Sequence, residues 1–168
     1  MDNPVVDVII PVCRPDEKYS RLLHKLEIQT VTVRQIIVIN TGRQFYDESR
    51  FSYNGTIKVR HIEFNEFDHG RTRHEGIMSS DADYCLLMTQ DAVPADDRIV
   101  ESLLECFQNP EIAVAYARQL PEDNCRIIER LARQFNYPEK SSIKRKEDIE
   151  KLGIKAFFCS DVCAMYDR

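Results

Sequence analysis

The sequence lacks the features that mark membrane-spanning and secreted proteins. Within its 168 residues, no apolar run approaches the roughly 20 residues that a transmembrane helix needs. The N-terminal segment MDNPVVD has no basic stretch followed by an apolar one, as a secretory signal peptide would. We therefore expect a cytoplasmic protein.

Three further absences exclude other classes. The net charge of −5 leaves no surplus of basic residues for coating nucleic acid. The six cysteines include no CxxC pair, which argues for reduced, buried thiols rather than a zinc site or a disulfide framework. Cys13-Arg14-Pro15 follows the first apolar run where a phosphate-binding loop would have glycines, and this argues against a nucleotidyltransferase.

The chain does contain an alternation of apolar runs and helical patterns. With 43% hydrophobic and 30% charged residues, its composition is that of one globular domain, and we predict a single domain over residues 1–168. Strand, helix and strand within the first 40 residues indicate an α/β protein with a mostly parallel sheet flanked by helices. The predicted strands are residues 5–12, 35–39, 57–64, 84–88 and 112–117, and the predicted helices are 16–29, 71–80 and 95–109.

Residues 121–153 are more charged and less periodic than the rest. Ile127, Ile128, Leu131 and Phe135 predict one amphipathic helix there, and residues 146–152 a short second one. The basic run 144–146 is typical of a solvated surface, with contact to an anionic partner as the alternative.

Polar clusters follow the first four predicted strands. In a parallel sheet, the carboxyl ends of the strands meet at one edge, where ligands bind. Arginines and free helix amides suit phosphate oxygens, and a lone carboxylate beside them suits a divalent cation that bridges to the phosphates. The clusters are Arg14 with Asp16, Asn40-Thr41-Gly42, residues 69–74, and Thr89-Gln90-Asp91.

Five segments in order resemble the motifs of family 2 glycosyltransferases, and especially their rhamnosyltransferase-like branch. They are VDVIIPVCRP, QIIVINTG, FDHGRTRHEGI, LLMTQDAVPAD and FFCSDVCAMYDR, which together span nearly the whole chain. The resemblance implies the GT-A type of nucleotide-diphospho-sugar transferase fold. It also implies transfer of a sugar from a nucleoside-diphosphate donor, with Mg or Mn as the cofactor.

The resemblance also implies a role for individual residues. Asp91 stands at the last position of an Asp-x-Asp motif whose first acid is replaced by Thr89, so Asp91 alone would ligate the metal. Arg73 matches the arginine of an Ala-Arg-Asn pattern. Where many relatives have an acid after the second strand, this chain has Asn40. The implied nucleotide-binding residues are Pro11, Val12, Arg14, Asn40, Thr41, Gly70, Arg73, Thr89, Gln90 and Asp91.

Each of these positions also has a simpler structural interpretation. Asp91 could cap the helix predicted from Ala95, and Arg71 and Arg73 could be plain surface charges. His69 and His74 receive no chemical role. Asp161, placed by the pattern at another strand end, could face the sugar or cap a helix.

An inverting transfer needs a general base, which in the resembled family belongs to an acidic pair downstream of the segment that ends at Arg168. We therefore expect a C-terminally truncated domain that holds mainly the donor-binding part and is inactive or weakly active alone. The expected donor is dTDP-rhamnose, and the expected acceptor is a saccharide or lipid-linked polysaccharide at the inner membrane face, with peripheral membrane association. The alternatives are a non-catalytic nucleotide-binding or regulatory module and a nucleotidyltransferase.

Overall fold

The computed structural model describes residues 4–122 and 125–168, and the chain divides into two compact units. One comprises Met1–Tyr116 and Asp161–Arg168, and we call it the sheet unit. The other, Ala117–Ser160, is the helical unit. The division reflects how densely each part contacts itself, and the expected single catalytic domain stays a prediction.

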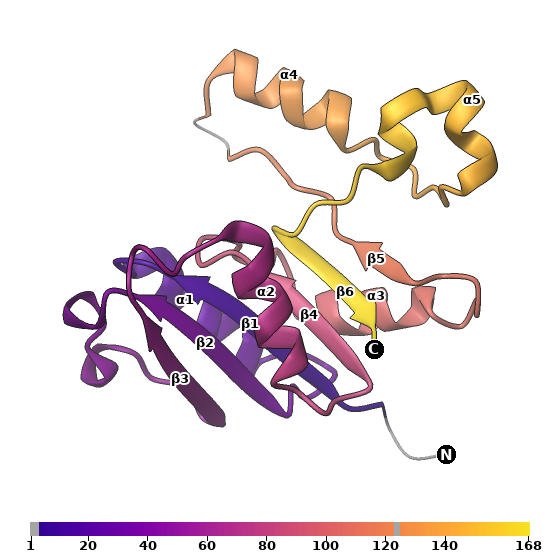
Figure 1. Ribbon diagram of the computed structural model, residues 1–168. Helices are drawn as coiled ribbons and strands as arrows, with labels where there is room; N and C mark the ends of the chain where they lie inside the picture. Colours follow the sequence, from indigo (N-terminus) through magenta and orange to yellow (C-terminus); the bar gives the residue numbers. More distant parts are fainter. Residues whose placement is uncertain (1–3, 123–124) are drawn as a thin grey trace. The chain divides into compact units, whose positions relative to one another are not determined.

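The sheet unit is built on one six-stranded sheet with the strand order β3-β2-β1-β4-β6-β5 (Figure 1). The first four strands in the sequence pair in parallel, whereas β6 runs antiparallel to β4 and to β5. The predicted mostly parallel α/β sheet is thus confirmed. The strands are β1 Val6–Val12, β2 Gln35–Thr41, β3 Thr56–Ile62, β4 Tyr84–Met88, β5 Val114–Tyr116 and β6 Cys163–Asp167.

Helices cover both faces of this sheet. The helix α2 (His69–Met78) lies on one face, and α1 (Glu17–Glu27) and α3 (Ile99–Cys106) lie on the other (Figure 1). Asp16 begins α1 because its carboxylate accepts the backbone N–H of Lys18 at 2.9 Å. Two short 3₁₀ helices, η1 (Arg43–Phe45) and η2 (Glu48–Arg50), lie between β2 and β3.

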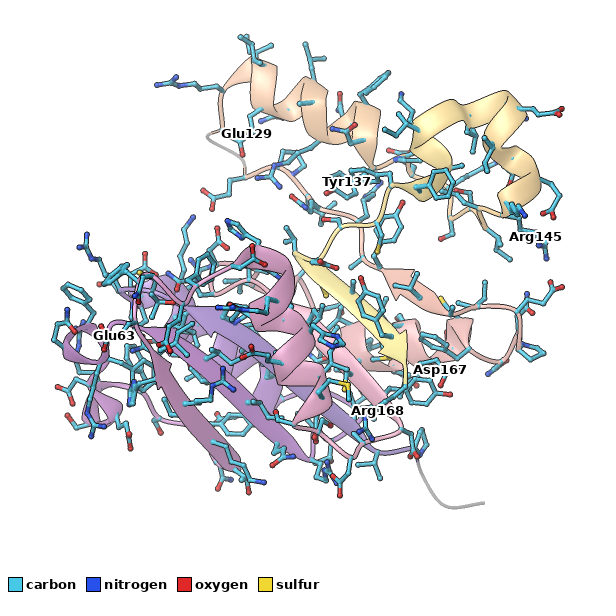
Figure 2. The ribbon with its side chains drawn as sticks, viewed as in Figure 1. Glu63, Glu129, Tyr137, Arg145, Asp167 and Arg168 are labelled. Carbon is cyan, nitrogen blue, oxygen red and sulfur yellow. The ribbon has the colours of Figure 1, made fainter. Side chains whose placement is uncertain are left out.

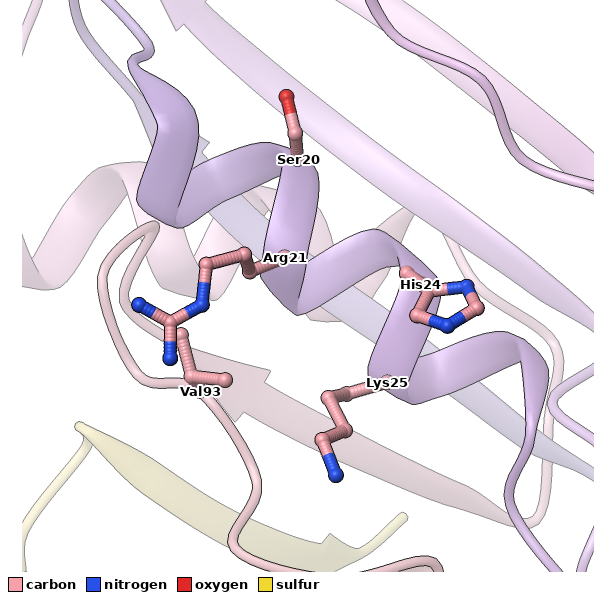
Figure 3. A pocket seen from close by; sticks show the side chains of 5 residues that line it. All are labelled: Ser20, Arg21, His24, Lys25 and Val93. Atoms are coloured by element: carbon pink, nitrogen blue, oxygen red, sulfur yellow. The ribbon is translucent and has the colours of Figure 1, made fainter.

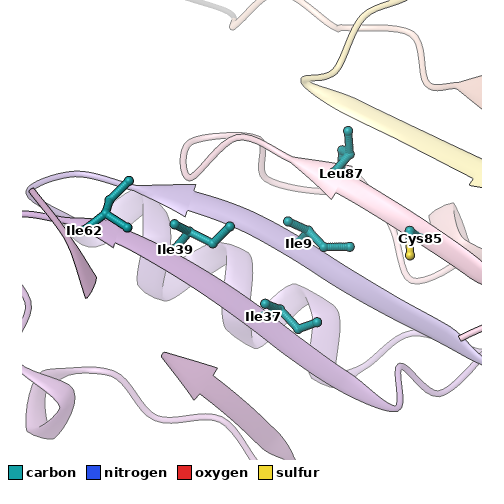
Figure 4. Packing of buried hydrophobic residues seen from close by; sticks show 6 residues of the cluster. All are labelled: Ile9, Ile37, Ile39, Ile62, Cys85 and Leu87. Atoms are coloured by element: carbon teal, nitrogen blue, oxygen red, sulfur yellow. The ribbon is translucent and has the colours of Figure 1, made fainter. Parts of the chain in front are cut away.

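The core beneath α2 consists of alternate residues of adjacent strands (Figure 4). Because side chains alternate between the faces of a strand, residues two apart in β2 point toward the same helix. Gly76 lets α2 approach closely, since a Cβ built there would lie 2.5 Å from Ile9 Cγ2. The buried cluster is Ile9, Ile37, Ile39, Ile62, Cys85 and Leu87.

The amino-terminal end of the sheet is fixed by a buried charge, that of Asp7. Its carboxylate is inaccessible to solvent and accepts two hydrogen bonds from Arg34, at 2.8 and 2.6 Å, and one each from Gln35 and Ser80. Burial alone would raise the pKa of Asp7, but the hydrogen bonds from Arg34, Ser80 and Gln35 hold it below its ordinary value. A buried carboxylate with this many donors stabilises the fold only while it is charged.

Two predicted boundaries were wrong for the same physical reason. The strand β2 continues through Asn40, which pairs with both β1 and β3, and Thr41, which pairs with β3, although both residues favour turns. The helix predicted from Ala95 begins only at Ile99, so Asp96 and Asp97 precede it. The backbone carbonyls of these two aspartates accept hydrogen bonds from Gln29 and Thr30 instead. Long-range partners overrode local preference in both places.

The helical unit contains α4 (Ile127–Asn136), η3 (Lys146–Asp148), α5 (Ile149–Leu152) and η4 (Gly153–Phe157). Polar contacts join its parts: Arg133 pairs with Glu129 at 2.9 Å, and the hydroxyl of Tyr137 donates to Ser160 at 2.9 Å. Glu129 and Tyr137 are labelled in Figure 2. No apolar side chain is buried among its described residues, 117–122 and 125–160. In the part of the chain that the structure describes, no helix is both long enough and apolar enough to cross a bilayer.

Candidate functional site

The carboxyl ends of the four parallel strands lie along one edge of the sheet, which we call the rim. The strands β1, β2, β3 and β4 end there at Val12, Thr41, Ile62 and Met88. The polar segments that follow these strands are therefore brought to one edge, as the sequence predicted. The contacts below show which of the predicted residues are available to a ligand and which are engaged within the protein.

Gln90 joins two of the rim segments. Its side-chain amide donates to the carbonyl of Cys13 at 3.1 Å, and its carbonyl accepts the N–H of Cys13 at 2.7 Å. Both hydrogen-bonding groups of the amide are thus engaged, which makes Gln90 a positioning residue that holds the loop after β1 against the loop after β4. Sequence reasoning placed Gln90 in the site but could not find this contact, because its partner is 77 positions away.

Arg14 is held in an uncommon backbone conformation beside an aromatic pair. Its φ of 51° lies in the left-handed region that residues other than glycine rarely adopt. The guanidinium carbon lies 4.5 Å from the ring centroid of Phe45, and Phe45 meets Phe64 edge to face at 6.1 Å. Since Phe64 is about half exposed, Arg14, Phe45 and Phe64 form a partly exposed cationic and aromatic surface. Sequence reasoning missed the two phenylalanines, and the only signal that could have found them is an aromatic residue within a polar segment.

Asn40 and Thr41 lie deeper than the sequence suggested, because both are buried. The amide nitrogen of Asn40 lies 3.1 Å from the carbonyl oxygen of Gly42 and 3.1 Å from Nδ1 of His61. Its Oδ1 accepts no hydrogen bond from the described residues. The predicted contact of Asn40 with a ligand therefore stays a prediction. Pro11 is half-buried, and Val12 is buried.

The amino-terminal end of α2 is capped by Asp68. Its carboxylate accepts the backbone N–H groups of Gly70 at 3.0 Å and Arg71 at 2.7 Å. These hydrogen bonds hold the pKa of Asp68 below its ordinary value, and the one from the backbone N–H of Arg71 has the largest effect. The amide of Gly70 is thus engaged with Asp68, and a phosphate could reach it only by displacing that carboxylate.

Of the two arginines in α2, Arg73 has the greater capacity for a ligand. Its Nη1 donates to the carbonyl of His69 at 2.8 Å, whereas its buried Nε–H has no acceptor among the described residues. Arg71 instead binds the carbonyl of Glu66 and lies 3.7 Å from Glu75. A buried N–H donor without a partner is costly, so an anion that approached Arg73 would satisfy it.

Asp91 supplies a carboxylate at the rim that is available to a ligand. It is exposed, and its side chain forms no hydrogen bond or ion pair with residues 4–122 or 125–168. It does not cap a helix, because α3 begins eight residues later and Arg98 precedes it. Thr89, half-buried beside it, donates its backbone N–H to Val162 at 3.1 Å.

The donor set at Asp91 fits a cation that is shared with a ligand. No group of three or more His, Cys, Asp or Glu side chains in the described residues comes together as a ligand set. Mg²⁺ and Mn²⁺ accept one or two carboxylates when phosphate oxygens and water supply the remaining ligands. An available carboxylate on the edge of the sheet that also carries Arg14 and Arg73 therefore suits a metal that arrives with a diphosphate.

Asp161 lies at the same edge for a reason that the sequence did not reveal. The prediction that it follows a strand was wrong: residues 153–157 form η4, and Asp161 precedes β6, which runs antiparallel to β4. Because β6 is antiparallel, its first residues reach the rim. The carboxylate of Asp161 accepts the hydroxyl of Tyr166 at 2.6 Å. No helix begins after it, so helix capping is excluded.

A hollow of about 270 Å³ is lined by none of these groups. It is lined by Ser20, Arg21, His24 and Lys25 of α1 and by Val93 (Figure 3). None of its lining residues belongs to the predicted site. We therefore do not assign it to the nucleotide.

A mostly parallel sheet with arginines and an available carboxylate at the carboxyl ends of its strands is typical of a nucleotide-binding α/β protein. Comparison with known proteins gives the family. Residues 7–168 match glycosyl transferase family 2, and the chain belongs to that family.

Two curated relatives and one solved structure are similar to the chain. The first relative is the O-antigen chain rhamnosyltransferase RfbN of Salmonella typhimurium, which is 35% identical over 97% of this chain and 52% of its own length. The second is the O-antigen chain rhamnosyltransferase WbaN of Salmonella anatum, which is 32% identical over 98% of this chain and 53% of its own length. The chain thus spans about half the length of these relatives. The mannosyltransferase PcManGT of Pyrobaculum calidifontis, solved with GDP-Man and Mn²⁺, superposes with a TM-score of 0.62 over 99% of this chain and 45% of its own, at 11% identity. It supports the predicted GT-A type fold.

Proposed function

We propose that this chain holds the donor site of an inverting glycosyltransferase that moves a sugar from a nucleoside diphosphate to a saccharide or lipid-linked acceptor. Membership of glycosyl transferase family 2 supports the reaction class. The names of the two Salmonella relatives support rhamnose as the sugar, and hence dTDP-rhamnose as the donor. The observation that carries the proposal is the available carboxylate of Asp91 at the rim, the edge of the sheet that also carries Arg14 and Arg73.

In this proposal, each rim residue has a distinct task. The Arg14, Phe45 and Phe64 surface receives the nucleoside, because aromatic rings and a guanidinium stack on a base. Arg73 donates its unpaired N–H to a diphosphate oxygen, and Gln90 keeps the two loops at the spacing that the ligand needs. Asp91 would hold Mg²⁺ or Mn²⁺, and the metal would supply charge stabilisation for the departing diphosphate. Asp161 lies at the rim, where its carboxylate can orient a sugar hydroxyl.

A non-catalytic nucleotide-binding or regulatory module is the second candidate. It is favoured by one observation: Asp91 stands without a second acid in an Asp-x-Asp motif, since Thr89 replaces that acid. Such a module would bind nucleotide without needing a metal. The metal requirement therefore discriminates between the two functions.

The test is calorimetric titration with thymidine and uridine diphosphates, with and without Mn²⁺. We expect binding that requires Mn²⁺ and that Asp91→Ala weakens at least tenfold, since a shared metal contributes several kcal/mol. The matched control is Asp97→Ala. Asp97 is another exposed aspartate of the same connection, but its backbone carbonyl accepts the N–H of Thr30 just beyond α1, at the opposite end of the sheet. Metal-independent binding would instead support the regulatory module.

We further propose that the protein works in the cytoplasm, at the inner face of the membrane, where a lipid-linked acceptor would be found. The experiment is fractionation of cells that produce the tagged chain. Recovery outside the cytoplasmic and inner-membrane fractions would overturn this location.

A further inference from the structure

The helix α4 of the helical unit exposes its apolar side to solvent, which is the opposite of an ordinary surface helix. A surface helix normally packs its apolar stripe inward and presents its charged side to water. In α4 the polar side makes the contacts: Arg133 binds Gln119, and Gln119 in turn donates to Ser160 at 2.9 Å. Its apolar side chains Ile127, Ile128, Leu131 and Phe135 are between 58% and 82% exposed.

The exposed apolar side continues beyond α4. Lys155 of η4 lies 3.6 Å from the ring centroid of Phe135, so η4 adjoins the carboxyl end of the apolar stripe. In η4 itself, Ile154 is 88% exposed and Phe157 is 70% exposed. Among the residues that the structure describes, twelve large hydrophobic side chains are exposed, and nine of these fall within residues 117–160. We call Ile127, Ile128, Leu131, Phe135, Ile154 and Phe157 the apolar patch.

The charge of the helical unit differs in sign from that of the rest of the chain. Residues 117–160 hold ten of the 23 Lys and Arg residues and seven of the 28 Asp and Glu residues. Their net charge is therefore +3, whereas the remaining residues carry −8. Basic side chains accompany the apolar ones: Lys155 lies over Phe135, and Lys144 lies 5.1 Å from the ring centroid of Phe158.

We propose that the helical unit is a docking surface for an anionic lipid bilayer, with the apolar patch inserted at the level of the headgroups. An amphipathic helix with an uncovered apolar side binds in the plane of the membrane interface, and basic residues beside it bind the anionic headgroups. The positive charge of this unit alone complements such a surface, because the sheet unit would be repelled by it. The proposal is independent of the donor site, since none of its residues lies at the rim.

The test is sedimentation of the full chain with vesicles of phosphatidylcholine, with or without phosphatidylglycerol. We expect at least about tenfold stronger binding to the vesicles that contain phosphatidylglycerol, and weaker binding as salt increases. The double variant Ile128→Ser, Leu131→Ser should lose at least about tenfold in affinity. Lys155→Gln with Lys146→Gln should lose several-fold, and only on the anionic vesicles.

Matched controls on the sheet unit are Met78→Ser, an exposed apolar residue of α2, and Lys58→Gln, an exposed cation of β3. Both should bind vesicles as the unmodified chain does, and circular dichroism should show all variants folded. Equal binding to both vesicle types, or binding unaffected by the patch variants, would overturn the proposal. It would also be overturned if no vesicle binding occurred and the chain self-associated through the apolar patch. In that case a second copy of the chain, rather than lipid, would cover the patch.

Discussion

The two units of this chain are stabilised in opposite ways. In the sheet unit, strands and helices enclose alternating Ile, Val and Leu side chains, and one buried carboxylate, that of Asp7, has four donors. In the helical unit, polar side chains connect the segments, and the apolar ones face outward. The sheet unit is therefore the rigid part that can hold a ligand at fixed geometry. The helical unit has an exposed apolar surface that a membrane or another molecule can cover.

The comparison is tested most strongly by the same substitution in both units. Leu22→Ala in α1 removes a fully buried side chain and should lower the free energy of unfolding by about 3 kcal/mol. Leu131→Ala in α4 removes one that is 58% exposed and should change it by less than about 0.5 kcal/mol. Denaturant titration of both variants measures the difference. Equal losses in the free energy of unfolding would contradict the contrast drawn between the sheet unit and the helical unit.

Breaking a charged contact should likewise cost more stability in the sheet unit than in the helical unit. Asp7→Asn puts an N–H₂ group among the donors of Arg34, Gln35 and Ser80, and should cost about 2 kcal/mol at neutral pH. Glu129→Gln weakens a solvated pair with Arg133 and should cost less than about 1 kcal/mol. Thermal unfolding of both variants provides the comparison.

The lowered pKa of Asp7 predicts that the stability of the chain depends on pH. Because the folded-state pKa of Asp7 is lowered, its contribution is complete above the ordinary value of 3.8 and is lost as the pH falls below it, through the folded-state pKa. Unfolding measured across the acid range should show a smaller loss of stability for Asp7→Asn than for the unmodified chain. Parallel curves would show that Asp7 does not contribute to the acid sensitivity.

Within α2, two glycines should respond differently to the same change. Gly76→Ala places a methyl group against Ile9 and should cost about 1 to 2 kcal/mol, because the helix must move off the sheet. Gly70→Ala meets only the Asp68 carboxylate at 3.6 Å and should be neutral or slightly stabilising. Chemical denaturation of the pair checks whether the close approach is real.

The last of these predictions concerns the rim. Gln90→Ala removes both hydrogen bonds to Cys13 at an exposed site and should cost about 1 kcal/mol. Its effect on diphosphate affinity should be larger than this, because the loop that carries Arg14 is released. A variant that binds diphosphate as well as the unmodified chain does would remove Gln90 from the positioning role.

Much of the sheet unit could be predicted from local pattern. The strand Tyr84–Met88 was predicted at its observed bounds, and α1 and α2 to within two or three residues, because their apolar periods and breakers are clear. The sequence could not indicate that Asn40 continues a strand, that Gln90 binds Cys13, or that Asp161 precedes an antiparallel strand. Each depends on a partner far away in the chain. The helix α4 was predicted correctly, whereas the outward direction of its apolar side depends on tertiary contacts that no helical period encodes.

The most direct test of our account is the pattern of Mn²⁺-induced broadening in the amide NMR spectrum with a nucleoside diphosphate present. We predict selective broadening at Ala92, Cys13 and Gly70 around the rim, and none at Thr30 or Asp97 at the opposite end of the sheet. The pattern should vanish in Asp91→Ala. Broadening centred on the helical unit, or an Asp91→Ala spectrum that still broadens at the rim, would contradict a donor site built around Asp91.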